Sequence, residues 1–167
     1  MRWPFFLSFP EAEGMAVVET LLLPQALDGQ ALYGRFVEAN RGAGAIVTFS
    51  GRVRGETTAG AVSHLWLDWY PGMSEQSLKA IAEAAAERFD VQALLVAHRC
   101  GEVKAEDEIV FVAAASAHRR AAFEAADYLM DRLKSEAALW KREVGEGFAR
   151  WVEPTAKDAE DLKRWTS

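Results

Sequence analysis

The order in which strand-like and helix-like segments follow one another constrains the fold of this chain more than any other feature. Apolar runs predict strands over residues 16–23, 45–54, 62–70, 91–97 and 109–115. Helical spacing predicts one long helix after an N-cap at Ser74 and a second over 118–135, followed by a hairpin turning at 145–147 and a short charged helix over 156–165. Strands and helices do not alternate regularly, which excludes a doubly wound sheet. We predict an α+β fold, with a mixed β-sheet and two long helices on one side.

The strand over 45–54 carries a polar face. Side chains alternate along a strand, so Arg52 and Arg54 share this face while Val53 lies opposite them. After a loop at 55–60 comes the strand over 62–70, and we expect these two strands to pair.

Size, charge and cysteine content restrict the class of protein. The chain has 167 residues and a net charge of -6, which argues against a general nucleic-acid or anionic-membrane binder. Its single cysteine, Cys100, excludes an internal disulfide and a cysteine-rich zinc site, and it fits a reducing, cytoplasmic setting. We expect one domain over 15–167, preceded by an irregular extension over 1–14, with Met15 as an alternative start.

Signatures of several large enzyme classes are absent from the sequence. It has no GxxxxGK phosphate loop, no HExxH and no GxSxG, and its three histidines lack metal-ligand spacing. We therefore predict no metal and no nucleotide cofactor. The chain does contain a scattered basic set: Arg52, Arg54, His118, Arg119, Arg120, Lys134, Lys141 and Arg142. This set is compatible with an anion-binding site, to which a helix N-terminus at His118 would contribute, although an ordinary solvated surface is the more common outcome for such a set.

Lys134 has a distinctive position in the predicted long helix. Phe123, Ala126, Met130 and Leu133 form the expected inner stripe, and Lys134 lies only ~20° from Phe123 around the helix axis. Partial desolvation there would lower the pKa of the lysine toward a range useful for proton transfer. The alternative is a lysine that extends to solvent and complements the helix dipole.

Cys100, His64 and His98 have simpler interpretations. A lone cysteine at the end of a strand is typical of a small buried apolar side chain, although a role in sulfur chemistry remains open. We expect both histidines to be structural.

An ordered set of short segments resembles a known family. The set comprises Gly44-Ala-Ile-Val-Thr-Phe-Ser-Gly-Arg-Val-Arg54, Tyr70-Pro-Gly-Met73, His98-Arg-Cys-Gly-Glu102, Asp107-Glu-Ile-Val-Phe-Val112, Ser116-Ala-His-Arg119 and Trp140-Lys-Arg-Glu143. Together these segments are similar to the large, catalytic subunit of molybdopterin synthase, over nearly the whole chain from about Met15 to Trp165. No single segment is specific, but their order is.

The resemblance implies an α/β-hammerhead type fold and a homodimer within a heterotetramer. It also implies a small ubiquitin-like partner whose C-terminal Gly-Gly carries a thiocarboxylate. The implied activity is a sulfurtransferase reaction that converts cyclic pyranopterin monophosphate into the molybdopterin dithiolene. This chain ends in Arg-Trp-Thr-Ser167 and therefore corresponds to the acceptor subunit rather than the sulfur carrier.

The resemblance also implies a set of site residues. Lys134 and Lys141 match the catalytic lysines, and the substrate-contacting stretches match Arg52, Val53, Arg54, His118, Arg119, Lys134, Lys141, Arg142 and Glu143. The N-terminal extension and Cys100 depart from the family pattern. Two other classes stay open, namely a non-catalytic phosphate- or pterin-binding module and a phosphohydrolase on the same fold.

Overall fold

The structure, a computed structural model, describes residues 14–58 and 60–166. Its elements are β1 (Val17–Leu23), α1 (Gly29–Ala39), β2 (Ala45–Arg52), β3 (Glu56–Thr57), β4 (Gly60–Trp69), α2 (Met73–Arg88), β5 (Ala93–Arg99), β6 (Gly101–Lys104), β7 (Glu108–Ser116), α3 (Arg119–Glu136), β8 (Leu139–Gly145), β9 (Phe148–Val152) and α4 (Ala156–Lys163). The predicted α+β class is confirmed. The predicted extension over 1–14 lies, except for Gly14, outside the described residues. No helix in the described part of the chain is long and apolar enough to cross a membrane.

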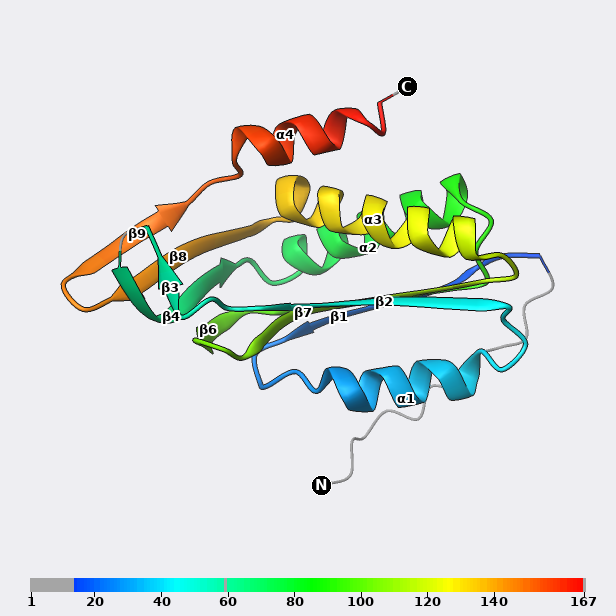
Figure 1. Ribbon diagram of the computed structural model, residues 1–167, viewed down its shortest axis with the longest axis horizontal. Helices are drawn as coiled ribbons and strands as arrows, with labels where there is room; N and C mark the ends of the chain where they lie inside the picture. Colours follow the sequence, from blue (N-terminus) through cyan, green and yellow to red (C-terminus); the bar gives the residue numbers. More distant parts are fainter. Residues whose placement is uncertain (1–13, 59, 167) are drawn as a thin grey trace.

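A four-stranded sheet forms the centre of the molecule. Its strand order is β1-β5-β7-β2, with β1 parallel to β5 and the other pairs antiparallel. Helices α2 and α3 cover one face of this sheet, as predicted, while α1 covers the other (Figure 1). The central strands β5 and β7 are therefore buried on both faces, which explains why their sequences are almost continuously apolar.

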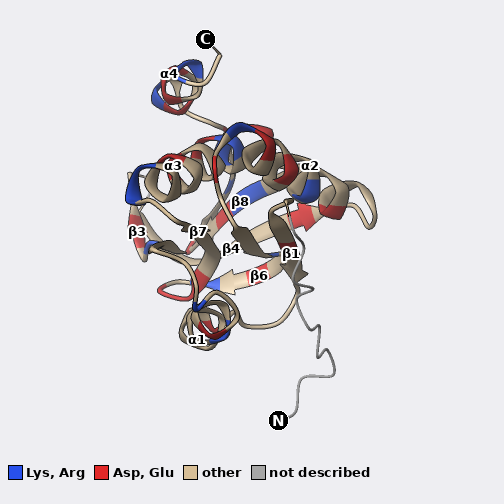
Figure 2. Cartoon of the chain, turned by 90° about the vertical axis from the view of Figure 1, so that its right-hand side faces the viewer, with Lys and Arg blue, Asp and Glu red and all other residues tan. Residues whose placement is uncertain are grey.

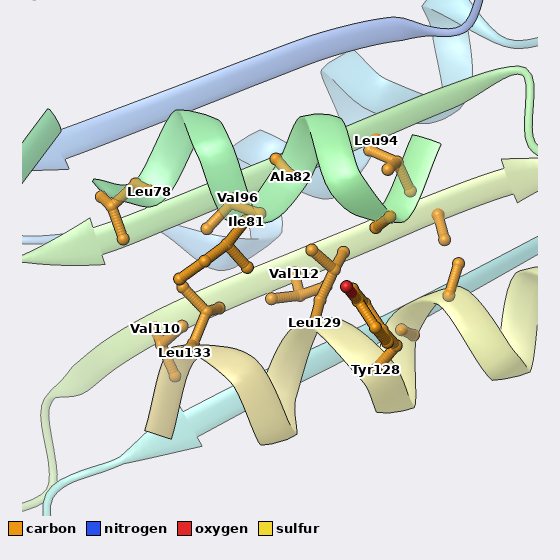
Figure 3. Close-up of a cluster of buried hydrophobic side chains, with 14 of the residues drawn as sticks. Leu78, Ile81, Ala82, Leu94, Val96, Val110, Val112, Tyr128, Leu129 and Leu133 are labelled. Carbon is orange, nitrogen blue, oxygen red and sulfur yellow. The ribbon is translucent and has the colours of Figure 1, made fainter. Parts of the chain in front are cut away.

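The larger core lies between this sheet and the two long helices. Alternation along β5 directs Leu94 and Val96 to this side, where Leu129 and Leu133 of α3 meet them (Figure 3). Leu95 of β5 points to the opposite side and packs with Phe36 of α1 in a smaller core. The two cores hold the central sheet rigidly between its helices.

A second sheet changes the predicted strand pairing. It has the order β3-β4-β8-β9, and β6 also pairs with β4. The expected pairing of the strands over 45–54 and 62–70 is wrong, because β2 pairs with β7 while β4 pairs with β8 and β6. Because β7 is buried, its backbone needs a hydrogen-bonded strand along each of its two edges, and β2 supplies one of these strands. Strand β6 lies in a stretch that the sequence predicts as a polar loop.

Candidate active site

The predicted site residues fall into two groups at opposite ends of the molecule. Helix α3 runs unbroken from Arg119 to Glu136, so Arg119 and Lys134 are separated by ~22 Å along its axis, from fifteen residues at 1.5 Å each. Arg52 lies opposite Glu108 at the start of β7, whereas His118 follows the end of that strand. The start of α3 and the strand β8 accordingly lie far apart in Figure 1. Within one chain, His118 and Arg119 are remote from Arg52, Lys134 and Lys141.

Lys134 does not lie on the buried face of α3. The side chain of Phe123, expected on the inner stripe, is 61% exposed, and the buried face instead follows Ala122, Ala125, Ala126, Leu129 and Leu133. Lys134 shares the exposed side with Phe123 and keeps 55% of its side chain accessible. Its ammonium group donates a hydrogen bond to Asp158 Oδ1 of α4 at 3.0 Å. The prediction that Lys134 is desolvated is therefore wrong. It assumes that Phe123 lies on the buried face of α3, whereas Phe123 faces solvent.

Lys141 on β8 is the lysine in a desolvated position. Its register partner on β4 is Leu67, which is fully buried. Burial lowers the pKa of Lys141, the charge of Lys134 lowers it further, and the carboxylate of Asp158 partly opposes both effects. A larger fraction of Lys141 is thus neutral near physiological pH than for an ordinary lysine, which suits it to accept a proton.

His98 on β5 is a neutral polar group on the side of the central sheet that α2 and α3 cover. Alternation places its side chain on the face that Leu94 and Val96 share, and the residue is buried. Its Nδ1 lies 2.8 Å from the carbonyl oxygen of Arg99, so Nδ1 carries the proton and Nε2 has the free lone pair. Burial, together with the charge of Lys141, lowers the pKa of His98 to about 4. The imidazole therefore stays neutral beside the lysine.

Arg142 and Glu143 have structural partners on the second sheet. The Arg142 guanidinium lies 5.3 Å from the centre of the Trp151 ring. Glu143 is buried and accepts from Arg150 Nε at 2.8 Å and from Thr57 Oγ1 at 3.4 Å. Because neighbours on a strand point to opposite faces, Glu143 shares a face with Lys141 and Arg142 does not.

The arginine stretch at the end of β2 is held by the turn before β7. Arg52 Nε donates to the carbonyl oxygen of Glu106 at 2.7 Å, and the backbone of Val53 pairs with Glu106 and Asp107. Val53 itself is buried in the larger core, so its side chain is a packing group. Arg54, one residue further, is exposed and able to reach a ligand.

His118 and Arg119 form a second basic group, at the start of α3. Both residues are exposed, and His118 is the N-cap residue without a side-chain capping bond. The first backbone N–H groups of the helix together with these two side chains suit an anion such as a phosphate.

Sequence reasoning missed two groups that act on Lys141. Asp158 was visible only as part of a Thr155–Asp158 capping box, which is a local signal and does not predict a contact with α3. The hydrogen bond of His98 agrees with the prediction that this residue is structural. Its electrostatic contact with Lys141 depends on the packing of β8 near β5, for which the sequence holds no signal.

This fold and site define an α+β domain with a desolvated lysine at one end and an exposed basic helix N-terminus at the other. The family model described as "MoaE protein" matches residues 23–136. The molybdopterin synthase catalytic subunit of Caulobacter vibrioides is 44% identical over 144 residues, covering 86% of this chain and 95% of that protein. The protein of the same name from Escherichia coli is 46% identical over 122 residues, covering 73% and 81%.

Solved structures agree with this assignment. The molybdopterin biosynthesis MoaE protein from Burkholderia ambifaria superposes with a TM-score of 0.73 at 33% identity, covering 92% of this chain and 99% of that one. This chain belongs to the MoaE family.

Proposed function

We propose that this chain is the catalytic subunit of a molybdopterin synthase, a sulfurtransferase of molybdenum cofactor biosynthesis. Its sulfur donor is the thiocarboxylated C-terminal Gly-Gly of a small ubiquitin-like partner, and its substrate is cyclic pyranopterin monophosphate. The product is the molybdopterin dithiolene. The observation that carries the proposal beyond family membership is the pair formed by Lys141, whose pKa is lowered, and the neighbouring Lys134.

Lys141 is the acid–base group in this proposal. The thiocarboxylate sulfur attacks a carbon of the pterin, so a carbon–sulfur bond forms while a carbon–oxygen bond at the same carbon breaks, and the ammonium form of Lys141 donates a proton to the departing oxygen. Water then cleaves the acyl–sulfur bond: the neutral amine of Lys141 accepts one proton of the water, the other passes to solvent, the sulfur stays on the pterin as a thiolate, and the partner leaves as a carboxylate. Lys134, which is exposed and paired with Asp158, orients the tail of the partner. Two partner molecules supply the two sulfurs.

The phosphate of the substrate binds at His118 and Arg119 in the proposed site. These residues lie ~22 Å along α3 from Lys134, which exceeds the length of a tricyclic pterin phosphate. One chain therefore cannot grip both ends of the substrate with these residues. In a homodimer, two-fold symmetry can bring Arg119 of one subunit beside the Lys134 and Lys141 of the other. Arg52 and Arg54 complete the lysine end, whereas Arg142 points to the opposite face of β8 from Lys141 and packs on Trp151.

The assembly follows from the same proposal. Two copies of this chain form the central dimer, and one small partner on each copy makes a heterotetramer. The cytoplasm suits this protein because Cys100 is a buried free thiol, as expected in a reducing compartment.

The test is reconstitution of sulfur transfer. The chain is incubated with a thiocarboxylated small partner and the pyranopterin, and formation of the dithiolene is measured; the same partner with an ordinary C-terminal carboxylate is the control. Product that depends on the thiocarboxylate supports the proposal. Binding of the pterin without product would indicate a binding module, and release of inorganic phosphate would indicate a phosphohydrolase.

A further inference from the structure

The link between α3 and β8 is fastened to helix α2 by two serine side chains. We propose that Ser74 and Ser77 of α2 are positioning residues for sulfur transfer, because they hold this link and thereby fix the placement of Lys134 relative to Lys141. The inference rests on the proposed function for the role of the lysines, while the contacts that carry it are independent of that role.

Each serine hydroxyl uses its donor and its acceptor capacity at this junction. Ser77 Oγ donates to the carbonyl oxygen of Glu136 at 3.3 Å and accepts from the backbone N–H of Ala138 at 3.0 Å. Ser74 Oγ donates to the carbonyl oxygen of Ala138 at 2.7 Å and accepts from the backbone N–H of Tyr70 at 3.0 Å. Both backbone groups of Ala138 are thus held by α2.

Neither serine is the N-cap of its own helix. Ser74, predicted as the N-cap of α2, lies inside the helix, where Gly72 is the N-cap residue and Glu75 Oε2 accepts from its N–H at 2.7 Å. Three residues apart, Ser74 and Ser77 share one helix face, and Ser74 is only 1% exposed. Serine is a poor residue for a helix interior, and here its hydroxyl satisfies backbone groups that the end of α3 leaves free.

The junction has two further restraints. The backbone N–H of Leu139 donates to the carbonyl oxygen of Ala137 at 2.7 Å, and Ala137 packs against the larger core, but neither contact reaches the backbone groups of Ala138 that the serines hold. We call the hydrogen bonds of Ser74 and Ser77 to this link the clamp. A further contact lies beside it, where the ring of Tyr70 meets that of Trp140 edge to face at 5.3 Å. Lys134 and Lys141 are only seven positions apart in the sequence, and the clamped segment lies in the middle of this stretch.

The placement of this stretch sets the electrostatics of Lys141. The charged and titratable groups that act on it come from three elements: Lys134 from α3, Asp158 from α4 and His98 from β5. Loosening the junction would move Lys141 away from Lys134 and toward water. Both changes favour the ammonium form, so the pKa of Lys141 would rise.

The experiment uses the full chain with its thiocarboxylated partner. In Ser77→Ala we expect kcat to fall about tenfold with little change in KM, since misplaced catalytic groups slow the bound reaction. The acidic limb of the pH–kcat profile should move upward by up to about one pH unit. Ser77→Thr, which retains the hydroxyl, should recover most of both losses, and Ser74→Ala provides the same test if Ser77→Ala does not fold.

The matched control is Asn40→Ala. Asn40 Nδ2 donates to the carbonyl oxygen of Phe36 at 2.8 Å near the end of α1, on the opposite face of the central sheet. This variant loses a similar bond without touching the lysines, so its pH profile should match the wild type. An equal shift in Asn40→Ala, or a wild-type profile in folded Ser77→Ala, would overturn the inference.

An NMR titration of carbon-labelled lysine separates this inference from the proposed function. It reports the pKa of Lys141 without any assay of activity. A raised pKa in Ser77→Ala, in a protein whose Lys141→Ala variant remains fully active, would support the clamp while removing Lys141 from the mechanism. An unchanged pKa in Ser77→Ala would remove the clamp whatever the lysines do.

Discussion

The ammonium group of Lys134 on α3 and the carboxylate of Asp158 on α4 lie 3.0 Å apart, and this contact joins the candidate active site to the C-terminal helix. The other oxygen of Asp158 accepts from the backbone N–H and the hydroxyl of Thr155 at 2.8 and 2.7 Å. Burial would raise the pKa of Asp158, but these hydrogen bonds outweigh it and lower the pKa to about 2. Charged residues on both α3 and α4 are visible in Figure 2. The carboxylate is therefore ionised throughout the physiological range.

Replacing Asp158 by Asn tests its effect on Lys141. Asparagine keeps an acceptor for the capping box and removes the charge. Since the charge of Asp158 raises the pKa of Lys141, its loss should lower this pKa and move the acidic limb of the pH–kcat profile to lower pH. Asp161→Asn is the control, because Asp161 pairs with Lys157 on the same helix. A shift to higher pH, or none, would contradict the expected coupling.

The two lysines should respond differently to arginine. Lys141→Ala should slow single-turnover product formation by about 10²- to 10⁴-fold, as expected for loss of a general acid–base group. Lys141→Arg should not restore it, because a guanidinium stays protonated. Lys134→Arg should retain much more activity, since an exposed cation paired with Asp158 needs only its charge. Wild-type turnover in Lys141→Arg would exclude proton transfer by this residue.

Arg119 should contribute mainly to substrate affinity. A charged hydrogen bond to a phosphate is worth roughly 1.5 to 3 kcal/mol, so Arg119→Ala should weaken binding of the pyranopterin by about ten- to a hundredfold. Arg120→Ala is the matched control, because Arg120 is exposed and lies 3.7 Å from Glu124 on the same helix. Calorimetry on both variants measures the difference, and equal affinities would place the phosphate elsewhere.

Local patterns in the sequence predict most elements, whereas strand pairing depends on contacts that no local pattern records. The hairpin around 145–147 follows from its turn residues and lies where expected. The partner of β2 does not follow in this way, because β2 joins β7 nearly sixty residues later. Apolar runs on β7 predict burial, but they do not say which strand will cover its open edge.

The candidate site, too, is predicted only in part by the sequence. The basic residues are evident in the sequence, and the helix that separates Arg119 from Lys134 is predicted by its period. The sequence does not predict which lysine is desolvated, because this depends on the pairing of Lys141 with the buried Leu67 across β8 and β4 and on the approach of α4 to Lys134. The predicted buried face of the helix is wrong because it includes Phe123, a large apolar residue that faces solvent.

Cys100 should be dispensable for sulfur transfer. It is 2% exposed, and burial raises the pKa of its thiol, so its reactive thiolate is scarce at neutral pH. Cys100→Ser should form product at the wild-type rate, while its thermal midpoint falls because a hydroxyl is buried in place of sulfur. Alkylation of native Cys100 should be slow until the protein unfolds. Loss of product in a folded Cys100→Ser variant would instead make this thiol a sulfur relay.

Subunit mixing tests whether the active site is shared across the dimer. If the Arg119 of one subunit faces the Lys141 of the other, a heterodimer of Arg119→Ala and Lys141→Ala chains contains one site with both residues intact and one that lacks both. At equal mixing about half of the dimers are heterodimers, each with one working site, so roughly a quarter of the wild-type activity should return. Each variant alone should stay nearly inactive at a substrate concentration well below the weakened affinity of Arg119→Ala. If verified heterodimers recover no activity, each site is built within one chain, and a phosphate held ~22 Å from Lys134 along α3 cannot belong to the substrate that reacts there.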